Sequence, residues 1–227
     1  YADCENYGEP SKVNIYAGAG MGDSYLAPEG QLLSVEGLTD DEAVLIEPFA
    51  VSLHAALKRV PKEGEKVLVI GAGMIGLGLI QFLKILQPKC KVYVMERNPN
   101  KHEFAKKLGA DEILVGEPYE AVKNATGAKM YGKGGNRMLL GGFDVIYDCV
   151  GKKTMLNDTL RWRKAQGTLV KIGYQMTKTK FDETPIWWQG LTIIGADSHG
   201  MENYNGKKIS TFEIVKDMML KKQLITD

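Results

Sequence analysis

Short apolar runs alternate along the chain with longer segments whose apolar residues recur at helical spacing. The runs are rich in β-branched side chains, which is typical of parallel strands that are buried on both faces. The six predicted strands are residues 67–70, 91–95, 112–115, 143–148, 168–173 and 191–195. Strands that alternate with helices in this way predict an α/β fold, a doubly wound parallel sheet of six strands.

The first helical segment carries both a start signal and an interruption. Thr39 is followed by three acidic residues, a capping signal, and an apolar pattern then runs over residues 43–59. Pro48 lies inside this pattern, so we expect a break or kink there and two helices. Further helices are predicted over residues 77–86, 98–108, 117–125, 152–163 and 209–220.

Two segments lack such patterns. Residues 126–142 are rich in Gly and Lys and predict a long surface loop, whose basic part, residues 129–137, we expect to be mobile and solvated. Residues 1–38 contain few apolar clusters, and the strand-like runs there are 24–27 and 32–35. Because this piece cannot build a core of its own, we interpret residues 1–38 as the remnant of a neighbouring domain and residues 39–227 as the α/β domain.

The most informative stretch is Gly71-Ala72-Gly73-Met74-Ile75-Gly76, which follows the first predicted strand and opens a helix. Gly71 permits a tight turn, Gly73 lets a pyrophosphate approach the backbone, and Gly76 lets the helix pack close to the strand. The amides of the first turn, with Met74 and Ile75, and the helix dipole offer positive charge to that pyrophosphate. The context predicts a Rossmann dinucleotide site. The alternatives are a glycine-rich turn that binds nothing and a methyltransferase with its nucleoside over a related turn.

The choice between NAD and NADP depends on the end of the second predicted strand. Glu96 follows Gly76 by twenty residues, the distance at which an acid accepts hydrogen bonds from the adenosine ribose. A carboxylate there repels a 2′-phosphate and favours NAD. The adjacent Arg97 keeps NADP open, because a guanidinium accepts that phosphate. Lys101 is a further candidate for the ribose.

Composition excludes several classes of function. The 227 residues hold 29 Lys and Arg against 28 Asp and Glu, so no nucleic-acid partner is implied. No apolar run approaches membrane-spanning length, and no signal peptide is apparent. The three scattered cysteines, Cys4, Cys90 and Cys149, fit a reducing compartment, so we expect a cytoplasmic protein. The chain begins at Tyr1 and not Met, which we interpret as a cut from something longer.

Several segments, in order, resemble one family. They are residues 46–55, 67–76, 108–111, 143–151, 167–173 and 191–195. The chain is similar over roughly residues 23–222 to the zinc-dependent medium-chain alcohol dehydrogenases, and to their sorbitol and threonine dehydrogenase branch. The resemblance implies a GroES-like catalytic domain before the Rossmann domain, with residues 1–38 as its remnant. It also implies that Asp227 stops short of a return segment.

The same resemblance implies two zinc positions. Glu47 aligns with the group that approaches the catalytic zinc, and Cys4 with the last of four cysteines around a structural zinc. The other ligands of both ions are missing from this sequence, so we assign no catalytic residue. We expect this chain to bind dinucleotide without turnover by itself. His54, which follows Glu47 at helical spacing, is interpreted as a packing or interdomain residue and not as a ligand.

The resemblance also implies which residues line the cofactor. Cys149, Val150 and Gly151 belong to the adenosine and ribose side. The nicotinamide side is implied for Ile172, Gly173, Gly195, Ala196 and Ser198. Trp187-Trp188 is interpreted as buried packing or interdomain surface, and His102 as a solvated residue.

The function predicted for the intact protein is hydride transfer between an alcohol or polyol and a nicotinamide. Zinc acts there as the Lewis acid. A small-molecule alcohol is the expected partner, together with a second copy in a homodimer or homotetramer, because the sixth strand can be a sheet edge. The alternatives are a non-catalytic NAD-sensing module and a methyltransferase.

Overall fold

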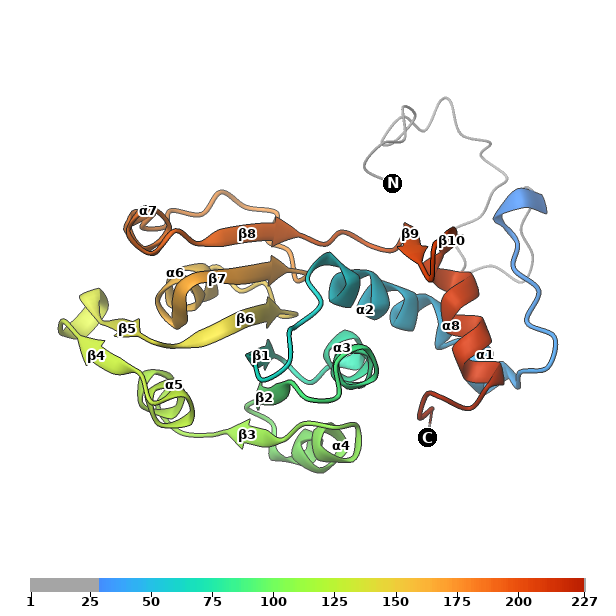
Figure 1. Cartoon of the computed structure of the whole chain (residues 1–227), viewed down its shortest axis with the longest axis horizontal. Helices are drawn as coiled ribbons and strands as arrows, with labels where there is room; N and C mark the ends of the chain where they lie inside the picture. The colour runs from blue at the N-terminus through green and yellow to red at the C-terminus, as the bar shows by residue number, and fades with distance from the viewer. Residues whose placement is uncertain (1–28, 227) are drawn as a thin grey trace.

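A six-stranded parallel sheet forms the centre of the computed structural model, which describes residues 29–226 (Figure 1). Its strands are β1 (Lys66–Ile70), β2 (Lys91–Met95), β3 (Glu112–Leu114), β6 (Phe143–Asp148), β7 (Arg163–Lys171) and β8 (Thr192–Gly195). Their order is β3-β2-β1-β6-β7-β8, so the chain runs outward from β1 to β3 and returns to place β6 on the other side of β1. This is the Rossmann order, with its switch point between β1 and β6. The predicted doubly wound sheet is confirmed.

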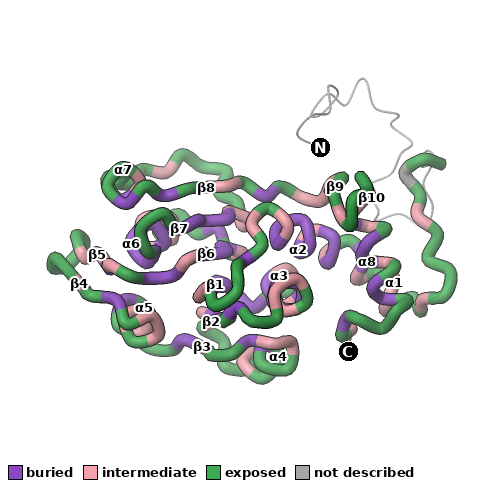
Figure 2. Tube along the Cα trace, viewed as in Figure 1, coloured by how far each residue is buried: buried purple, intermediate pink, exposed green. Residues whose placement is uncertain are grey.

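Helices cover both faces of the sheet (Figure 2). Successive side chains of a strand point to opposite faces. Val67 and Val69 of β1 join the core under α2 (Ile46–Lys58), α3 (Met74–Leu86), α4 (His102–Lys107) and α8 (Thr211–Leu220). Leu68 and Ile70 join the core under α5 (Pro118–Thr126) and α6 (Met155–Arg161). Burial on both faces explains why the strands are apolar without a break.

The expected pair of helices forms near the start of the described region, although Pro48 is not where the chain breaks. A capping box of Thr39 and Glu42 opens α1 (Asp40–Ala43), with Glu42 N donating to Thr39 Oγ1 at 3.2 Å. The interruption falls at residues 44–45, before α2. Pro48 lies in the first turn of α2, where an N–H has no partner within the helix and its loss is tolerated.

The prediction of a long surface loop over residues 126–142 is wrong, because the segment forms regular structure. The mobility expected for residues 129–137 stays a prediction. The antiparallel strands β4 (Lys129–Tyr131) and β5 (Met138–Leu140) form a hairpin, with the 3₁₀ turn η4 (Gly134–Asn136) between them. Leu139 is fully buried in the core beneath α5 and α6. The Arg137 guanidinium lies 4.0 Å from the centroid of the Tyr119 ring. These contacts anchor a segment whose Gly and Lys content indicated only solvation.

Other departures occur near the ends of the described region. Residues 32–35 form no strand, and the predicted strand 24–27 lies outside the described residues. The sequence did not indicate α7 (Thr184–Gln189), nor the hairpin of β9 (Met201–Tyr204) and β10 (Lys207–Ser210) that precedes α8. Trp187 and Trp188 on α7 are 82% and 53% exposed, so buried packing is wrong for both, and an interdomain surface stays a prediction. The 3₁₀ turns η2 (Glu29–Gln31) and η3 (Pro99–Lys101) complete the elements.

Candidate functional site

The glycine turn between β1 and α3 has the geometry that its three glycines predict. Gly71 has φ +91°, a conformation that L side chains rarely adopt. A Cβ on Gly76 would lie 1.9 Å from Gly71 O, so α3 packs against the turn only because residue 76 has no side chain. A Cβ on Gly73 would meet nothing within 4 Å among the described residues, which leaves this backbone open to a ligand.

The first turn of α3 presents unused donors at this opening. Gly73 is the N-cap and supplies no side chain, and the first helical bond runs from Leu77 N to Gly73 O at 2.9 Å. The amides before Leu77 therefore have no partner within the helix, and Gly73 and Met74 are exposed. Together with the helix dipole, they form a site of positive potential that can hold a phosphate group.

Glu96, at the end of β2, is held against this turn. Its Oε2 accepts from Ala72 N and its Oε1 from Asn98 N, both at 2.8 Å. Burial opposes the charge, but the backbone donors of Asn98 and Ala72 outweigh it and hold the pKa of Glu96 below its ordinary value. Each carboxylate oxygen keeps a further lone pair. Glu96 is thus an ionised acceptor fixed at the glycine turn.

The residues around Glu96 differ in exposure. Arg97 is exposed, while Lys101 is half-buried and close enough to favour the charged form of Glu96. His102 is also half-buried, with Nε2 2.9 Å from Glu96 O, so the interpretation of a solvated histidine is wrong. The ring therefore helps to position the end of β2.

On the other side of the switch point, a buried carboxylate organises the ends of β6 and β7. Asp148 is fully buried, and its Oδ1 accepts from Val150 N at 3.0 Å and from Gly151 N at 2.9 Å. Its Oδ2 accepts from Lys171 Nζ at 2.6 Å. Asp148 and Lys171 are register partners in the two strands, a relation that only the strand pairing reveals. The pair was not predicted from the sequence.

The Asp148 network brings the predicted cofactor residues to one edge. A Cβ on Gly71 would lie 2.6 Å from Val150 Cγ2, so Val150 packs directly on the glycine turn. A Cβ on Gly151 would lie 2.4 Å from Gly173 C, which shows that the loops after β6 and β7 are in backbone contact. Burial raises the pKa of Cys149, and the nearby Asp148 adds to this, so the thiol form of Cys149 is favoured.

The residues predicted for the nicotinamide side lie further along the same edge. Ile172 follows β7 directly, and Gly195 ends β8 next to it in the sheet. Ala196 is buried, with its N–H donating to Lys171 O at 2.8 Å. Ser198 has φ +53° and is half-buried. These positions share the carboxyl edge of the sheet with the glycine turn, where ligands of doubly wound sheets bind.

A contact between α2 and α3 fixes the glycine turn from behind, and the sequence analysis did not find it. Ser52 Oγ lies 2.9 Å from both Pro48 O and Ile75 O. A Cβ on Gly78 would lie 2.7 Å from Ser52 Oγ, so α2 and α3 approach closely at this point. The signal that was available was Gly78, a glycine inside a helix just beyond the motif.

The described residues do not form a zinc centre. Within residues 29–226, no group of three or more His, Cys, Asp or Glu side chains is placed to hold a metal ion. Glu47 is exposed in the first turn of α2, and Cys4 lies outside the described residues. His54 is buried, with Nδ1 2.6 Å from Glu202 Oε1 of β9, which confirms its interpretation as a packing residue. Burial, and then the charge of Lys58, lower the pKa of His54, while Glu202 opposes this.

A polar cleft of about 440 Å³ lies away from the glycine turn, between η4, α6 and residues 180–182. Asp158, Arg161 and Asp182, three of its four charged side chains, already have partners in the cleft. Arg161 Nη2 lies 2.6 Å from Asp182 Oδ2, and Tyr119 OH donates to Asp158 Oδ1 at 2.9 Å. Because these partners are fixed within the fold, we do not assign the cleft to the candidate site.

The sheet order and the open glycine turn at its switch point define a Rossmann-type nucleotide-binding fold. Residues 75–209 match the family model described as zinc-binding dehydrogenase. The chain belongs to this family, and the resemblance to the zinc-dependent medium-chain alcohol dehydrogenases is confirmed.

Named relatives show how much of a dehydrogenase the chain represents. It is 26% identical over 215 residues to L-galactonate-5-dehydrogenase of Escherichia coli (strain K12), covering 92% of this chain and 59% of that protein. It is 27% identical over 183 residues to sorbitol dehydrogenase 1 of Saccharomyces cerevisiae, covering 79% and 50%. A short chain alcohol dehydrogenase from E. coli CFT073, complexed with NADH, shares the fold with a TM-score of 0.68 and 24% identity, covering 84% and 51%. The chain thus spans little more than half of these proteins.

Proposed function

We propose that this chain is the nicotinamide-dinucleotide-binding part of a zinc-dependent alcohol or polyol dehydrogenase. The observation that carries the proposal is the glycine turn, where open amides at the start of α3 adjoin the fixed carboxylate of Glu96. Family membership and the dehydrogenase names of the relatives support it. A nicotinamide held by this domain would supply hydride transfer to or from the substrate carbon in the intact enzyme.

In this proposal, the pyrophosphate lies on the amides of Gly73, Met74 and Ile75. Glu96 accepts hydrogen bonds from the adenosine ribose with its remaining lone pairs. The nicotinamide extends past Val150 toward the ends of β7 and β8. NAD is preferred over NADP, because a 2′-phosphate would meet the ionised Glu96 before the exposed guanidinium of Arg97.

We assign no chemical step to zinc in this chain, because its described residues offer Glu47 alone at the implied position. The intact enzyme takes its remaining ligands from the part that the relatives have in addition. This chain by itself therefore binds dinucleotide without oxidising alcohol. A non-catalytic NAD-sensing module is the second candidate. Zinc-dependent alcohol oxidation by the intact protein excludes that candidate.

Fluorescence titration with NADH and NADPH tests the proposal directly. We expect saturable NADH binding, and Glu96→Ala should weaken NADH by about tenfold, roughly 1.4 kcal/mol, while weakening NADPH less. The NADPH arm is the internal control, since distortion of the turn would weaken both nucleotides equally. Absence of NADH binding, or tight binding of S-adenosylmethionine in its place, would contradict the proposal and favour the methyltransferase.

We also propose that the intact protein is a homodimer or homotetramer. Strand β8 lies at the edge of the sheet, and Ile193 in it is 41% exposed. An edge strand of this kind pairs readily with another strand. Light scattering on the purified protein measures its mass, and a monomer at micromolar concentration would refute this proposal.

A reducing, cytoplasmic location is proposed from the cysteines. Cys90 and Cys149 are unbridged, and burial raises the pKa of both thiols. In the part of the chain that the structure describes, no helix has the length and apolar character needed to cross a membrane. Cell fractionation of the parent organism tests the location.

A further inference from the structure

The side chain of Asp148 joins the loop after β6 to the end of β7. Asp148 is fully buried, and its Oδ1 accepts from Val150 N at 3.0 Å and from Gly151 N at 2.9 Å. Its Oδ2 accepts from Lys171 Nζ at 2.6 Å. The ammonium group on one oxygen therefore keeps the other oxygen turned toward the two loop amides.

Stability alone does not explain why an ion pair is buried here. The cost of removing two charges from water offsets most of their attraction, so apolar residues of the same volume generally stabilise a fold as well. The strands β1, β2 and β3 all end in apolar residues at this edge. A second pair, Lys164 Nζ and Asp144 Oδ1 at 2.5 Å, joins β7 and β6 near their amino ends, but the Lys164 side chain is 54% exposed. The buried pair thus occurs only at the end of these two strands where the cofactor is proposed to lie.

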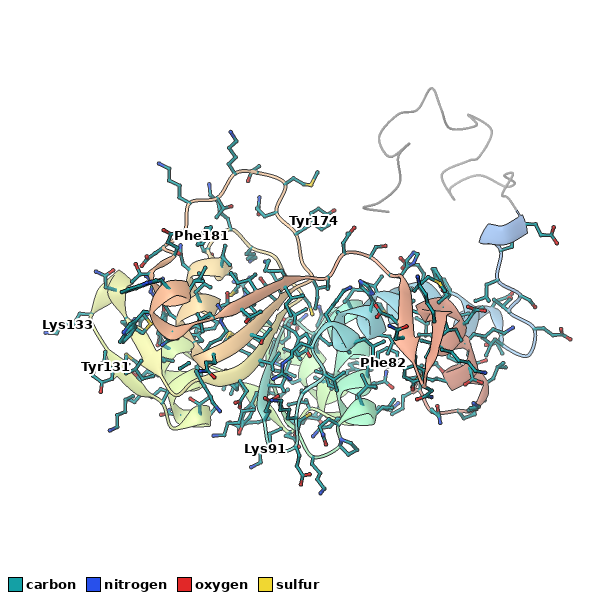
Figure 3. The ribbon with its side chains drawn as sticks, turned by 45° about the horizontal axis from the view of Figure 1, so that its top comes forward. Phe82, Lys91, Tyr131, Lys133, Tyr174 and Phe181 are labelled. Atoms are coloured by element: carbon teal, nitrogen blue, oxygen red, sulfur yellow. The ribbon has the colours of Figure 1, made fainter. Side chains whose placement is uncertain are left out.

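The backbone of Asp148 holds the loop after β7 as well. Asp148 O accepts from Ile172 N at 3.1 Å and from Gly173 N at 2.8 Å. A Cβ on Gly173 would lie 2.4 Å from Gly151 N, so the two loops touch directly beyond the pair. The segment from Tyr174 to Phe181, both labelled in Figure 3, then stands away from the sheet. Asp148 therefore fixes both loops up to the point where the chain leaves the sheet.

The two halves of the proposed cofactor site are held by separate carboxylates. Glu96, proposed for the adenosine ribose, follows β2, and β2 and β6 lie on opposite sides of β1. The donors to Glu96 are the amides of Ala72 and Asn98, which belong to neither β6 nor β7. A change at Asp148 should therefore leave the adenosine half in place.

We propose that Asp148 and Lys171 are positioning residues for the nicotinamide half of the cofactor. They act through the backbone of the loops after β6 and β7, which they hold in one conformation. Binding to a loop that is already ordered avoids the entropy cost of ordering it. Without Lys171, the carboxylate loses the partner of its Oδ2 and can turn away from the amides of Val150 and Gly151. The inference rests on the proposed dinucleotide site.

Isothermal titration calorimetry of the whole chain with NADH and with ADP tests this proposal. ADP carries the adenosine ribose and two phosphates, so it reports on the adenosine half alone. Lys171→Met should weaken NADH by about tenfold and ADP by less than about twofold. Lys171→Arg keeps the cation and should bind NADH within about threefold of the unchanged chain. The matched control Lys164→Met removes the ion pair at the other end of the same two strands and should leave both affinities unchanged.

The emission of bound NADH gives a second measurement, because it arises from the dihydronicotinamide alone. In Lys171→Met this emission should approach that of free NADH. The double variant Asp148→Asn/Lys171→Met leaves no unpaired buried charge and should show the same selective loss of NADH. It keeps the test decisive if Lys171→Met does not fold.

Failure of this proposal and failure of the proposed function give different results. Equal losses of NADH and ADP would overturn the positioning role, since the pair would then act on the glycine turn or on the whole fold. Equal affinity of the unchanged chain for NADH and ADP, or a loss in Lys164→Met as large as that in Lys171→Met, would contradict it too. An unchanged chain that binds neither nucleotide would refute the proposed cofactor site, and the positioning role with it.

Discussion

Adding one methyl group at Gly73 or at Gly76 should produce opposite results, because the two glycines face different surroundings. A Cβ at residue 76 would lie 1.9 Å from Gly71 O, whereas real Cβ contacts essentially never fall below 3.0 Å, so the backbone must move by about 1.1 Å. Overpacking against backbone costs up to ~3 kcal/mol, which lowers the Tm of a chain of this size by roughly 6–12 °C. Gly76→Ala should therefore be strongly destabilised.

Gly73→Ala should instead remain stable and lose its ligand. The φ of −82° and ψ of −175° at Gly73 suit any residue, and in the described part of the chain nothing lies within 4 Å of the added Cβ. The cost of Ala at an N-cap opposes the gain from a less flexible unfolded chain, so the free energy of unfolding should change by less than about 1 kcal/mol. The methyl group fills the approach of the pyrophosphate and should weaken NADH by at least about tenfold, ~1.4 kcal/mol.

Urea unfolding followed by circular dichroism gives the stability of both variants, and NADH fluorescence gives their affinities. The informative comparison is stability against affinity within each variant. Unchanged NADH affinity in Gly73→Ala would refute the placement of the pyrophosphate over this residue. Equal destabilisation of the two variants would refute the distinction between an open and a packed glycine.

Three further predictions test other parts of the fold. Leu139→Ala should cost ~2–5 kcal/mol of unfolding free energy, because Leu139 is fully buried. Tyr131→Ala, at a residue of the same hairpin that is 52% exposed, should cost less than about 0.5 kcal/mol. Equal effects of the two variants in urea unfolding would mean that the hairpin is not packed. Burial lowers the pKa of His54, so its contribution to stability is full above the unfolded pKa of about 6.5 and is lost as pH falls below that value. His54→Gln should therefore reduce the change of Tm with pH between pH 7.5 and 5, and an unchanged slope would contradict this. The pKa of Glu96 is also lowered, so its contribution to stability is full above the unfolded pKa of about 4.3 and is lost as pH falls toward the pKa of the folded state. Glu96→Gln should therefore reduce the fall of Tm at acidic pH, and an unchanged fall would show that Glu96 is not held by the backbone donors.

Local pattern determined what could be predicted from the sequence. The strand at residues 67–70 and the turn that follows it were predicted, because apolar runs and glycine spacing act within a few residues. Leu139 was missed, since its burial depends on α5 and α6, the helices before and after the hairpin, which lie beyond the reach of a local pattern. The Asp148–Lys171 pair was missed for a related reason, because only strand register makes the two residues neighbours. Ligand contacts, including those of Glu47, remain predictions because they involve groups beyond the described residues.

The backbone contact between Gly151 and Gly173 divides a fixed part of the chain, the ends of β6 and β7, from the replaceable loop that follows. Neither position has room for a side chain, so the place where the chain leaves β6 and β7 is fixed. Residues 174–181 begin only after this place, and most of them face solvent. A library that randomises these eight positions while keeping both glycines would vary the surface beside the proposed nicotinamide position without disturbing the strands. Replacing this loop should therefore alter which ligands the chain accepts while the sheet stays unchanged.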